Sequence, residues 1–260
     1  MSEIIKTENL QYAYPTEDGQ LSVPVLKGVN LSIRRGEFVA VLGHNGSGKS
    51  TLAGCFNAIR LPTGGVCYVD MMDTRDENNT YEVRKTVSMV FQNPDNQIIG
   101  NIVEEDVGFG PENIGVPTEE IWKRVEESLK AVGMTAYRLQ SPNKLSGGQK
   151  QRLSIARAIA KRPELFIFDD SFSALDYKTD VALRKALKKK TAQSTVLIVA
   201  QRISTILHAE QIIVLDEGKI AGIGTHRELL DSCEVYRQIA ASQLSEEELD
   251  LNGKGAEANA

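Results

Sequence analysis

The sequence has 260 residues, and it contains few cysteines, no long apolar run and no excess of positive charge. Its three cysteines, Cys55, Cys67 and Cys233, lack the spacing of metal ligands, so we expect buried thiols rather than a metal centre. No apolar run approaches the roughly 20 residues that a membrane helix needs. The first residues, Met1-Ser2-Glu3, do not resemble a signal peptide. These absences predict a cytoplasmic protein.

The charge balance bears on possible partners. The net charge is -5 at pH 7 and the isoelectric point is near 5.4, which argues against nucleic acid as a partner, although a local basic patch is compatible with both values. Hydrophobic residues make up 41% of the chain and charged residues 25%, ordinary values for a globular protein. A chain of this length forms one large domain, or a core with a smaller lobe.

The glycine-rich stretch Gly43–Thr51, GHNGSGKST, is the strongest motif in the sequence. It follows the apolar run 38–42 and precedes a helix-like segment at 52–59. This context is the one in which G-x-x-x-x-G-K-[ST] binds phosphate, because backbone N–H groups form an anion nest at a helix N-terminus. Lys49 is expected to reach the β- and γ-phosphates and Ser50 to ligate Mg²⁺. With ATP and Mg²⁺ as ligands, the predicted binding residues are Asn45, Gly46, Ser47, Gly48, Lys49, Ser50 and Thr51.

Polar residues that follow two other predicted strands are candidates for a role in ATP hydrolysis. Gln92 follows the strand-like run 87–91, where its amide could touch both Mg²⁺ and the attacking water. Asp169 ends the apolar run 165–168, the position at which a P-loop protein holds Mg²⁺. The next acid, Asp170, is placed to polarise water.

An aromatic residue ahead of the phosphate loop could stack on the nucleotide base. We favour Tyr14 over Tyr12 for this role. The alternative is that Tyr14 is a half-buried tyrosine of a strand.

The remaining pattern predicts an α/β protein, with a strand over 4–14 and a second strand pair within 23–33. Residues 73–80 and 100–117 have loop composition, whereas Thr118 is expected to cap a helix that runs to Ala131. Residues 96–160 therefore form a mostly helical lobe within a domain spanning 1–244. The acidic segment 245–260 is predicted to be a disordered tail.

A second glycine motif, Leu145-Ser146-Gly147-Gly148-Gln149, precedes a predicted amphipathic helix over 150–160. It offers another helix N-terminus to an anion. Because one chain then carries two phosphate-facing helix ends on different lobes, two chains are expected to share each nucleotide.

The order of these motifs resembles that of an ABC-type ATPase over residues 4 to about 240. The resemblance rests on the Walker A loop, Gln92, LSGGQ at 145–149, LFIFDD at 165–170, SALD at 173–176 and a polar residue at 201. It implies a P-loop core with an antiparallel β subdomain and an inserted helical subdomain. It also implies a head-to-tail dimer around two ATP molecules, coupled through the Gln92 loop to an integral membrane transporter subunit. The residues that it adds to the nucleotide site are Ser146, Gly147, Gly148, Gln149 and Asp176.

Two positions depart from the family pattern and bear on hydrolysis. The family usually has Glu where this chain has Asp170, and His where it has Gln201. An aspartate is one methylene shorter than a glutamate, so its carboxylate should lie roughly 1 Å or more from the best position for polarising the attacking water. Such a displacement can lower the rate of hydrolysis about a hundredfold. The neutral amide of Gln201 can hydrogen-bond the γ-phosphate but carries no proton or charge. The pair resembles the degenerate half of heterodimeric exporters, and the alternative is that Asp170 still works slowly.

The two halves of the chain resemble different branches of the family. Residues 1 to about 150, with MVFQNPDNQI, resemble energy-coupling factor ATPases of vitamin and cobalt or nickel uptake. From about residue 152, RLSIARAIAKRPELFIFDD resembles the nucleotide-binding domain of a multidrug-type exporter. This contrast predicts a recombined or engineered chain, the alternative being one divergent natural lineage.

The leading function is the ATP-binding and ATP-hydrolysing subunit of a transporter, peripheral on the cytoplasmic face of the membrane. The alternatives are a regulatory clamp without hydrolysis and an ABC ATPase that acts on DNA or ribosomes. A single Walker A motif, an acidic balance and the lack of coiled-coil heptads argue against the last. The transported substrate and the choice between homodimer and heterodimer are left open by the sequence.

Overall fold

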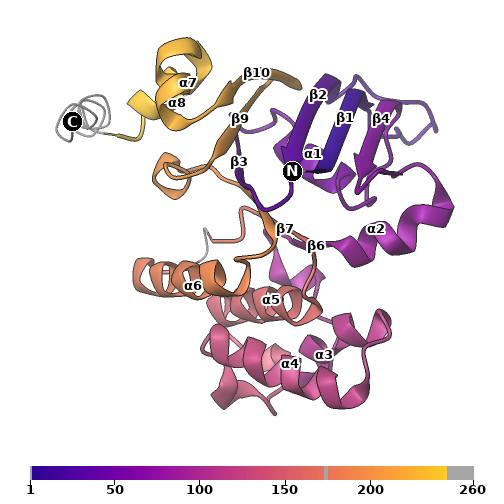
Figure 1. Ribbon diagram of the computed structural model, residues 1–260, viewed down its shortest axis with the longest axis vertical. Helices are drawn as coiled ribbons and strands as arrows, with labels where there is room; N and C mark the ends of the chain where they lie inside the picture. The colour runs from indigo at the N-terminus through magenta and orange to yellow at the C-terminus, as the bar shows by residue number, and fades with distance from the viewer. Residues whose placement is uncertain (1, 173–174, 245–260) are drawn as a thin grey trace. The chain divides into compact units, whose positions relative to one another are not determined.

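The computed structural model describes residues 2–172 and 175–244. The chain divides into two compact units (Figure 1). The first joins the N-terminal part of the chain, up to Val83, to the C-terminal part from Leu197, and the second is Arg84–Val196. The helix α2 (Thr80–Thr86) and the strand β8 (Thr195–Val199) each run across a boundary between the units.

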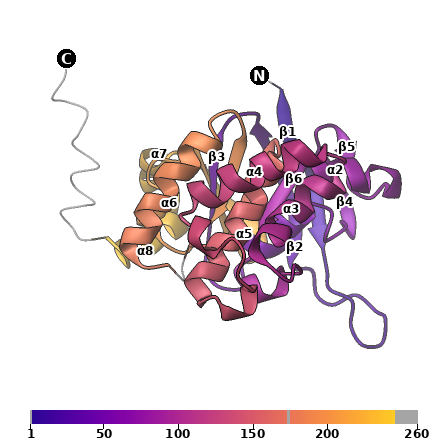
Figure 2. The same cartoon turned by 90° about the horizontal axis from the view of Figure 1, so that it is seen from below.

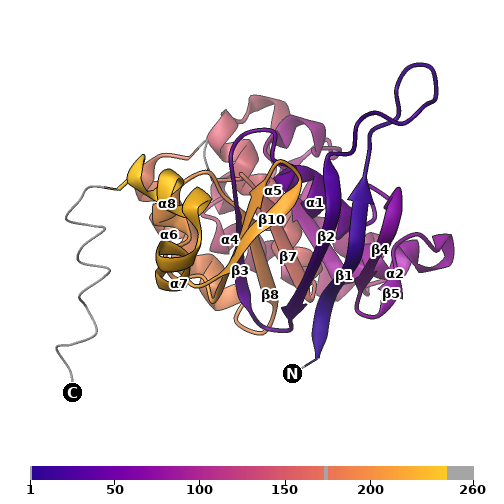
Figure 3. The same cartoon turned by 90° about the horizontal axis from the view of Figure 1, so that it is seen from above.

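An antiparallel sheet forms one part of the first unit. Its strands are β1 (Glu3–Tyr12), β2 (Leu26–Arg34), β4 (Gly64–Val69) and the short β5 (Met72–Asp73), in the order β2-β1-β4-β5. Figure 3 shows β2, β1 and β4 side by side, with the connection from β1 to β2 reaching beyond both strands. The alternation in the sequence buries one side of these strands, including Ile5, Leu10, Val29, Ile33 and Val69.

The other part of the first unit carries the glycine loop. Strand β3 (Phe38–Leu42) pairs in parallel with β9 (Gln211–Asp216), and β10 (Lys219–Gly224) pairs with β9 in the antiparallel sense. The glycine loop joins β3 to helix α1 (Lys49–Cys55). Helices α7 (His226–Ser232) and α8 (Glu234–Ala241) end the described chain and pack on β10 and β9.

The second unit combines two parallel strands with helices. Strand β6 (Val87–Val90) pairs in parallel with β7 (Leu165–Asp169), which is buried along its whole length. Helices α3 (Val103–Asn113), α4 (Thr118–Ala131) and α5 (Gly147–Lys161) pack against one another, as Figure 2 shows, and α6 (Tyr177–Lys190) contacts α4. Their shared core includes Val107, Val125, Leu129 and Leu153.

The loop composition of residues 100–117 gave a wrong prediction, because α3 occupies most of this stretch. Val103, Val107 and Pro111 lie four residues apart and are buried, so packing of this face outweighs the low helix propensity of glycine and proline. A Cβ on Gly108 would lie 3.4 Å from Ile121 and 3.7 Å from Val125, so the glycine lets α3 approach α4 closely.

Other boundaries were also wrong. Residues 77–79 form a short 3-10 helix that leads into α2, where a loop was expected. Only one strand forms in the stretch 23–33, beginning at Leu26. The N-cap of α4 is Pro117 rather than Thr118. The expectation of buried thiols is confirmed for all three cysteines, and burial raises the pKa of the Cys55 thiol to about 12. The predicted tail 245–260 lies outside the described residues.

Candidate nucleotide site

The glycine loop of the first unit has the geometry expected of a phosphate cradle. Gly46 and Gly48 adopt φ angles of +82° and +101°, a region that favours glycine. A Cβ on Gly43 would lie 2.1 Å from the carbonyl oxygen of Leu215, so only glycine lets the loop lie this close to the end of β9. The loop ends in α1, whose N-terminus carries the positive end of the helix dipole.

Lys49 holds its ammonium over this loop. Its Nζ donates to the carbonyl oxygens of Gly43 and His44, both at 2.8 Å, and the residue is only 7% exposed. The Ser47 hydroxyl is buried in the same loop and has no hydrogen-bond partner among the described residues. A fixed cation and an unsatisfied hydroxyl among backbone groups fit the triphosphate of a nucleotide. Asn45 and Ser50 lie exposed on either side of them.

Tyr14 lies beside α1 and is tethered through its hydroxyl. The hydroxyl is 3.0 Å from Thr51 Oγ1 and accepts a hydrogen bond of 3.1 Å from Arg60 Nε. The guanidinium carbon of Arg60 lies 5.5 Å from the centre of the Tyr14 ring. Tyr14 is 38% exposed and packs edge-on against Tyr12, which is less exposed. These contacts place a partly exposed ring next to the phosphate loop, and its stacking on a base stays a prediction.

Gln201 lies at the same edge of the first unit as the phosphate loop. The residue before it, Ala200, donates its N–H to the carbonyl of Val41 at 3.1 Å. Val41 belongs to β3, and the loop begins two residues later, at Gly43. The Gln201 side chain is exposed.

In the second unit, Gln92 and Asp170 meet. They follow β6 and β7, and carboxyl ends of parallel strands lie at one edge of a sheet. Gln92 Nε2 donates to Asp170 Oδ2 at 3.0 Å. The backbone of Asp170 has a φ of +46°, a conformation that only a few non-glycine residues adopt. Ser171 fixes the turn, because its hydroxyl donates to the carbonyl of Val90 at 2.8 Å.

Asp169, the last residue of β7, is 7% exposed. A carboxylate at a strand end supplies the oxygen ligands that Mg²⁺ prefers, so its position fits the predicted metal role.

The LSGGQ motif forms the start of α5 in the second unit. Ser146 is the N-cap, and its N–H donates to Gln149 Oε1 at 2.8 Å in a capping box. Gln149 was predicted to bind nucleotide, and its side chain is engaged within the helix end. Ser146 and Gly147 are exposed, and a Cβ on Gly147 would meet nothing within 4 Å. This helix end is therefore open to another molecule.

Asp176 has a local structural role that the resemblance did not suggest. Its carboxylate accepts the N–H of Thr179 at 3.0 Å and so caps α6. Ser173 and Ala174 of the same motif lie outside the described residues.

No pattern in the sequence indicated the contacts between α5 and the Gln92 loop. Lys150 Nζ lies 2.6 Å from Asp95 Oδ1, and Gln151 Nε2 donates to the carbonyl of Phe91 at 3.4 Å. Arg157 donates to the carbonyl of Gln97. The available signal was Gln151, a polar residue on the buried face of a helix.

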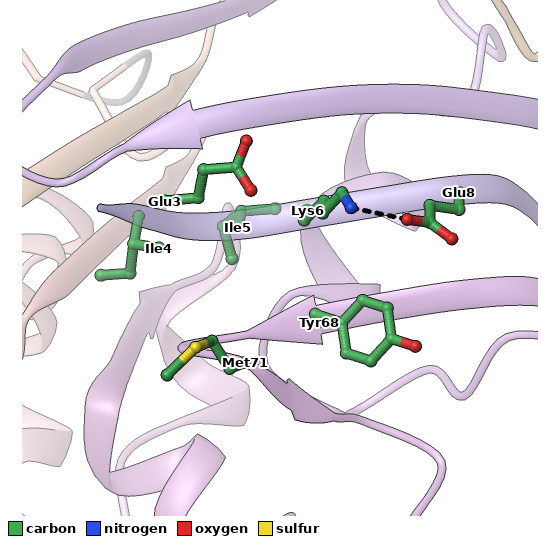
Figure 4. A pocket seen from close by; sticks show the side chains of 7 residues that line it. All are labelled: Glu3, Ile4, Ile5, Lys6, Glu8, Tyr68 and Met71. Atoms are coloured by element: carbon green, nitrogen blue, oxygen red, sulfur yellow. Dashed lines mark ion pairs between the residues drawn. The ribbon is translucent and has the colours of Figure 1, made fainter. Parts of the chain in front are cut away.

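A pocket on the antiparallel sheet contains none of the predicted nucleotide residues (Figure 4). Lys6 forms an ion pair with Glu8 across one side of it, with Nζ 2.7 Å from Oε1. Its other lining residues are Glu3, Ile4, Ile5, Tyr68 and Met71. Within residues 2–172 and 175–244, no helix is long and apolar enough to cross a membrane.

Comparison with known proteins assigns the family. The ABC transporter family model matches residues 26–173. The chain belongs to this family. It is 44% identical to the energy-coupling factor transporter ATP-binding protein EcfA1 of Caldanaerobacter subterraneus subsp. tengcongensis, an alignment that covers 96% of this chain and 94% of that protein. The chain is thus an ABC-type ATPase, with the expected combination of parallel strands, an antiparallel sheet and helices.

Two solved ABC proteins share the fold over most of the chain. CbiO1 from Clostridium perfringens, part of the ABC transporter complex cbiONQ, has a TM-score of 0.75 and 33% identity, covering 92% of this chain and 95% of that one. The ATP-binding cassette MJ0796, a dimer in a post-hydrolysis state with ADP and Pi, has a TM-score of 0.77 and 32% identity, covering 85% of this chain and 98% of that one.

The comparisons give no evidence for the interpretation of two joined halves. One energy-coupling factor relative matches 96% of the chain and so extends well past residue 150, where a join was expected. The exporter-like residues after 152 therefore lie within an energy-coupling factor type of sequence. Short motif likeness cannot separate branches of a family that share the same phosphate chemistry.

Proposed function

We propose that this ABC ATPase binds and hydrolyses ATP as the subunit that drives an energy-coupling factor type of transporter. It would bind an integral membrane subunit on the cytoplasmic face of the membrane. The proposal is supported by 44% identity to EcfA1 and by the likeness to CbiO1, which is part of a transporter complex. The observation that carries it is the phosphate loop, in which Lys49 Nζ lies 2.8 Å from two loop carbonyl oxygens.

Two such chains would close head to tail around two ATP molecules. The exposed Ser146 and Gly147 at the start of α5 support this arrangement, since a helix end open to solvent can receive the phosphates held by another chain. The family resemblance adds Gly148, Gln149 and Asp176 to that surface. The MJ0796 dimer provides a precedent within the family.

Within one chain, each residue would have a separate role at the nucleotide. The loop N–H groups and Lys49 would hold the phosphates, and Tyr14 would stack on the base. Ser50, Gln92 and Asp169 would hold Mg²⁺, which neutralises phosphate charge when bound. Asp170 would accept a hydrogen bond from the attacking water, and Gln201 would donate its amide to the γ-phosphate.

Hydrolysis in this site is expected to be slow. The Asp170 carboxylate is short, and one of its oxygens already accepts the Gln92 amide at 3.0 Å. Gln201 cannot become positively charged as a histidine can. A homodimer would therefore contain two slow sites, whereas a heterodimer could contain one slow and one fast site.

Steady-state Mg-ATP hydrolysis by the purified chain tests this proposal. The matched proteins are Lys49→Ala, which lacks the phosphate-loop cation, and the double variant Asp170→Glu, Gln201→His. We expect the parent to be close to Lys49→Ala and the double variant to turn over roughly a hundredfold faster than the parent. A parent rate far above that of Lys49→Ala, with no gain in the double variant, would show that Asp170 is sufficient.

A further inference from the structure

The turn that carries Gln201 is held by a side chain from the end of the described chain. Gln243 Nε2 donates to the carbonyl oxygen of Gln201 at 2.8 Å, and Gln243 Oε1 accepts the N–H of Ile203 at 2.9 Å. One amide group thus bridges the backbone on both sides of Arg202. It pairs with that backbone much as a neighbouring strand would.

Gln243 also supplies a cap that the local sequence lacks. A short 3-10 helix begins at Ile203, and its N-cap residue, Arg202, makes no capping hydrogen bond from its side chain. The first N–H groups of such a helix need an acceptor from elsewhere. Gln243, 40 residues further along the chain, provides one.

The anchor behind Gln243 is rigid. Its own N–H donates to the carbonyl of Ala240 at 3.0 Å, in the turn that ends α8. Helix α8 is fixed through Tyr236 and Ile239, which are 0% and 6% exposed, and Tyr236 OH lies 2.6 Å from His226 Nδ1. A packed helix therefore holds one side of the Gln201 turn.

The strand before the turn fixes its other side. Ala200 N–H bonds to Val41 of β3, next to the start of the phosphate loop. The contacts that fix the Gln201 backbone relative to that loop include the hydrogen bond that Ala200 donates to Val41 of β3 and the one that Gln243 donates to the Gln201 carbonyl. A shift of about 1 Å is sufficient to misplace a group in an active site.

From these contacts we infer that Gln243 is a positioning residue, which aims the Gln201 amide at the γ-phosphate by clamping the backbone of residues 201–203. The inference rests on the role proposed above for Gln201. Gln243 itself would not touch the nucleotide.

A γ-phosphate contact strengthens the binding of a nucleoside triphosphate but not of ADP. The readout is therefore the ratio of the Kd for ADP to the Kd for the non-hydrolysable analogue AMP-PNP, measured by calorimetry with Mg²⁺ on the full chain. We expect Gln243→Ala to lower this ratio about 3- to 10-fold, the value of one ordinary hydrogen bond. Gln238→Ala is the matched control, since Gln238 lies on the same helix and donates to Glu234 at 3.2 Å.

A double substitution separates positioning from general support of the fold. If Gln243 acts through Gln201, then Gln201→Ala combined with Gln243→Ala should have the same ratio as Gln201→Ala alone. A further loss in the double variant, or equal weakening of ADP and AMP-PNP by Gln243→Ala, would overturn the inference. Gln243→Glu, which keeps the acceptor for Ile203 and loses the donor to Gln201, serves if the alanine variant does not fold, and it should also lower the ratio.

The same data distinguish this inference from the role of Gln201. If Gln201→Ala lowers the ratio and Gln243→Ala does not, the clamp is unnecessary and Gln201 keeps its role. If Gln201→Ala leaves the ratio unchanged, Gln201 makes no γ-phosphate contact, and the positioning role of Gln243 is refuted with it.

Discussion

Gly218, in the turn between β9 and β10, is hydrogen-bonded to the phosphate loop. Replacing Gly218 by alanine should lower both the stability of the protein and its affinity for ATP. Its N–H donates to the carbonyl of Ser47 at 3.1 Å, and its carbonyl accepts the N–H of Lys27 at 2.8 Å. Its φ is +82°. A Cβ there would lie 2.0 Å from the carbonyl oxygen of Val25, a backbone atom that cannot rotate away.

The loss of unfolding free energy in Gly218→Ala can be estimated from these distances. Moving a Cβ from 2.0 Å to 3.4 Å, where ordinary contact begins, needs a displacement of 1.4 Å (3.4 − 2.0). Such a shift breaks the hydrogen bonds to Ser47 and from Lys27, at about 1 kcal/mol each. A left-handed alanine costs about 1–2 kcal/mol more. The sum for Gly218→Ala is about 3–4 kcal/mol of unfolding free energy.

Gly36 offers a matched control in the same unit. Its φ is also +82°, but a Cβ there would meet nothing within 4 Å. Gly36→Ala should therefore cost only the backbone component, about 1–2 kcal/mol. Thermal unfolding and ATP titration of both variants check this, with weaker ATP binding expected for Gly218→Ala alone. If the two variants melt at the same temperature and bind ATP equally, the packing argument is refuted.

Two charged residues of the second unit, one fully buried and one partly buried, give further predictions. Asp106 is fully buried, accepts the N–H groups of Ile99 and Gly100, and lies 3.5 Å from Arg157, so Asp106→Ala should destabilise the protein by about 3–5 kcal/mol in urea unfolding. Asp106→Asn keeps a hydrogen-bond acceptor and should therefore lose less stability than Asp106→Ala. An equal loss of stability in the two variants would contradict a role for both N–H groups. Burial lowers the pKa of Lys161 from 10.5 to about 8, so between these values the unfolded chain binds more protons and the stability contribution of Lys161 rises with pH. The unfolding free energy of the parent relative to Lys161→Met should therefore increase between pH 8 and pH 10, and a pH-independent difference would refute this.

The elements that the sequence predicted best are those with a strong local pattern. The run 38–42 with the glycines after it, and Ser146 with Gln149, encode their structure within a few residues. The helix α3 was missed because its buried face is recognisable only once α4 is packed on Gly108. Local propensity and tertiary packing disagree there, and packing determines the structure.

Motifs predicted the candidate site residues, but they did not predict the contacts that hold those residues in place. The Thr51 and Arg60 contacts of Tyr14, and the Gln243 contacts of Gln201, join residues 37 to 46 positions apart in the chain. A glutamine in a polar C-terminal segment has no pattern that distinguishes it from a solvated residue. Such contacts depend on how α8 and α1 pack, which the sequence does not encode locally.

The backbone at Asp170 gives a physical reason why an aspartate stands where the family usually has glutamate. With φ at +46°, this residue lies in the left-handed region, where aspartate is favoured over most side chains. A glutamate would bring its carboxylate closer to the position proposed for the attacking water, but it would incur more backbone strain and would have to share space with the Gln92 amide, which lies 3.0 Å from the Asp170 carboxylate. The gain in rate from Asp170→Glu should therefore come with a loss of stability, and the two effects can be measured separately. A variant that gains rate with unchanged stability would show that the backbone, rather than the carboxylate, adapts.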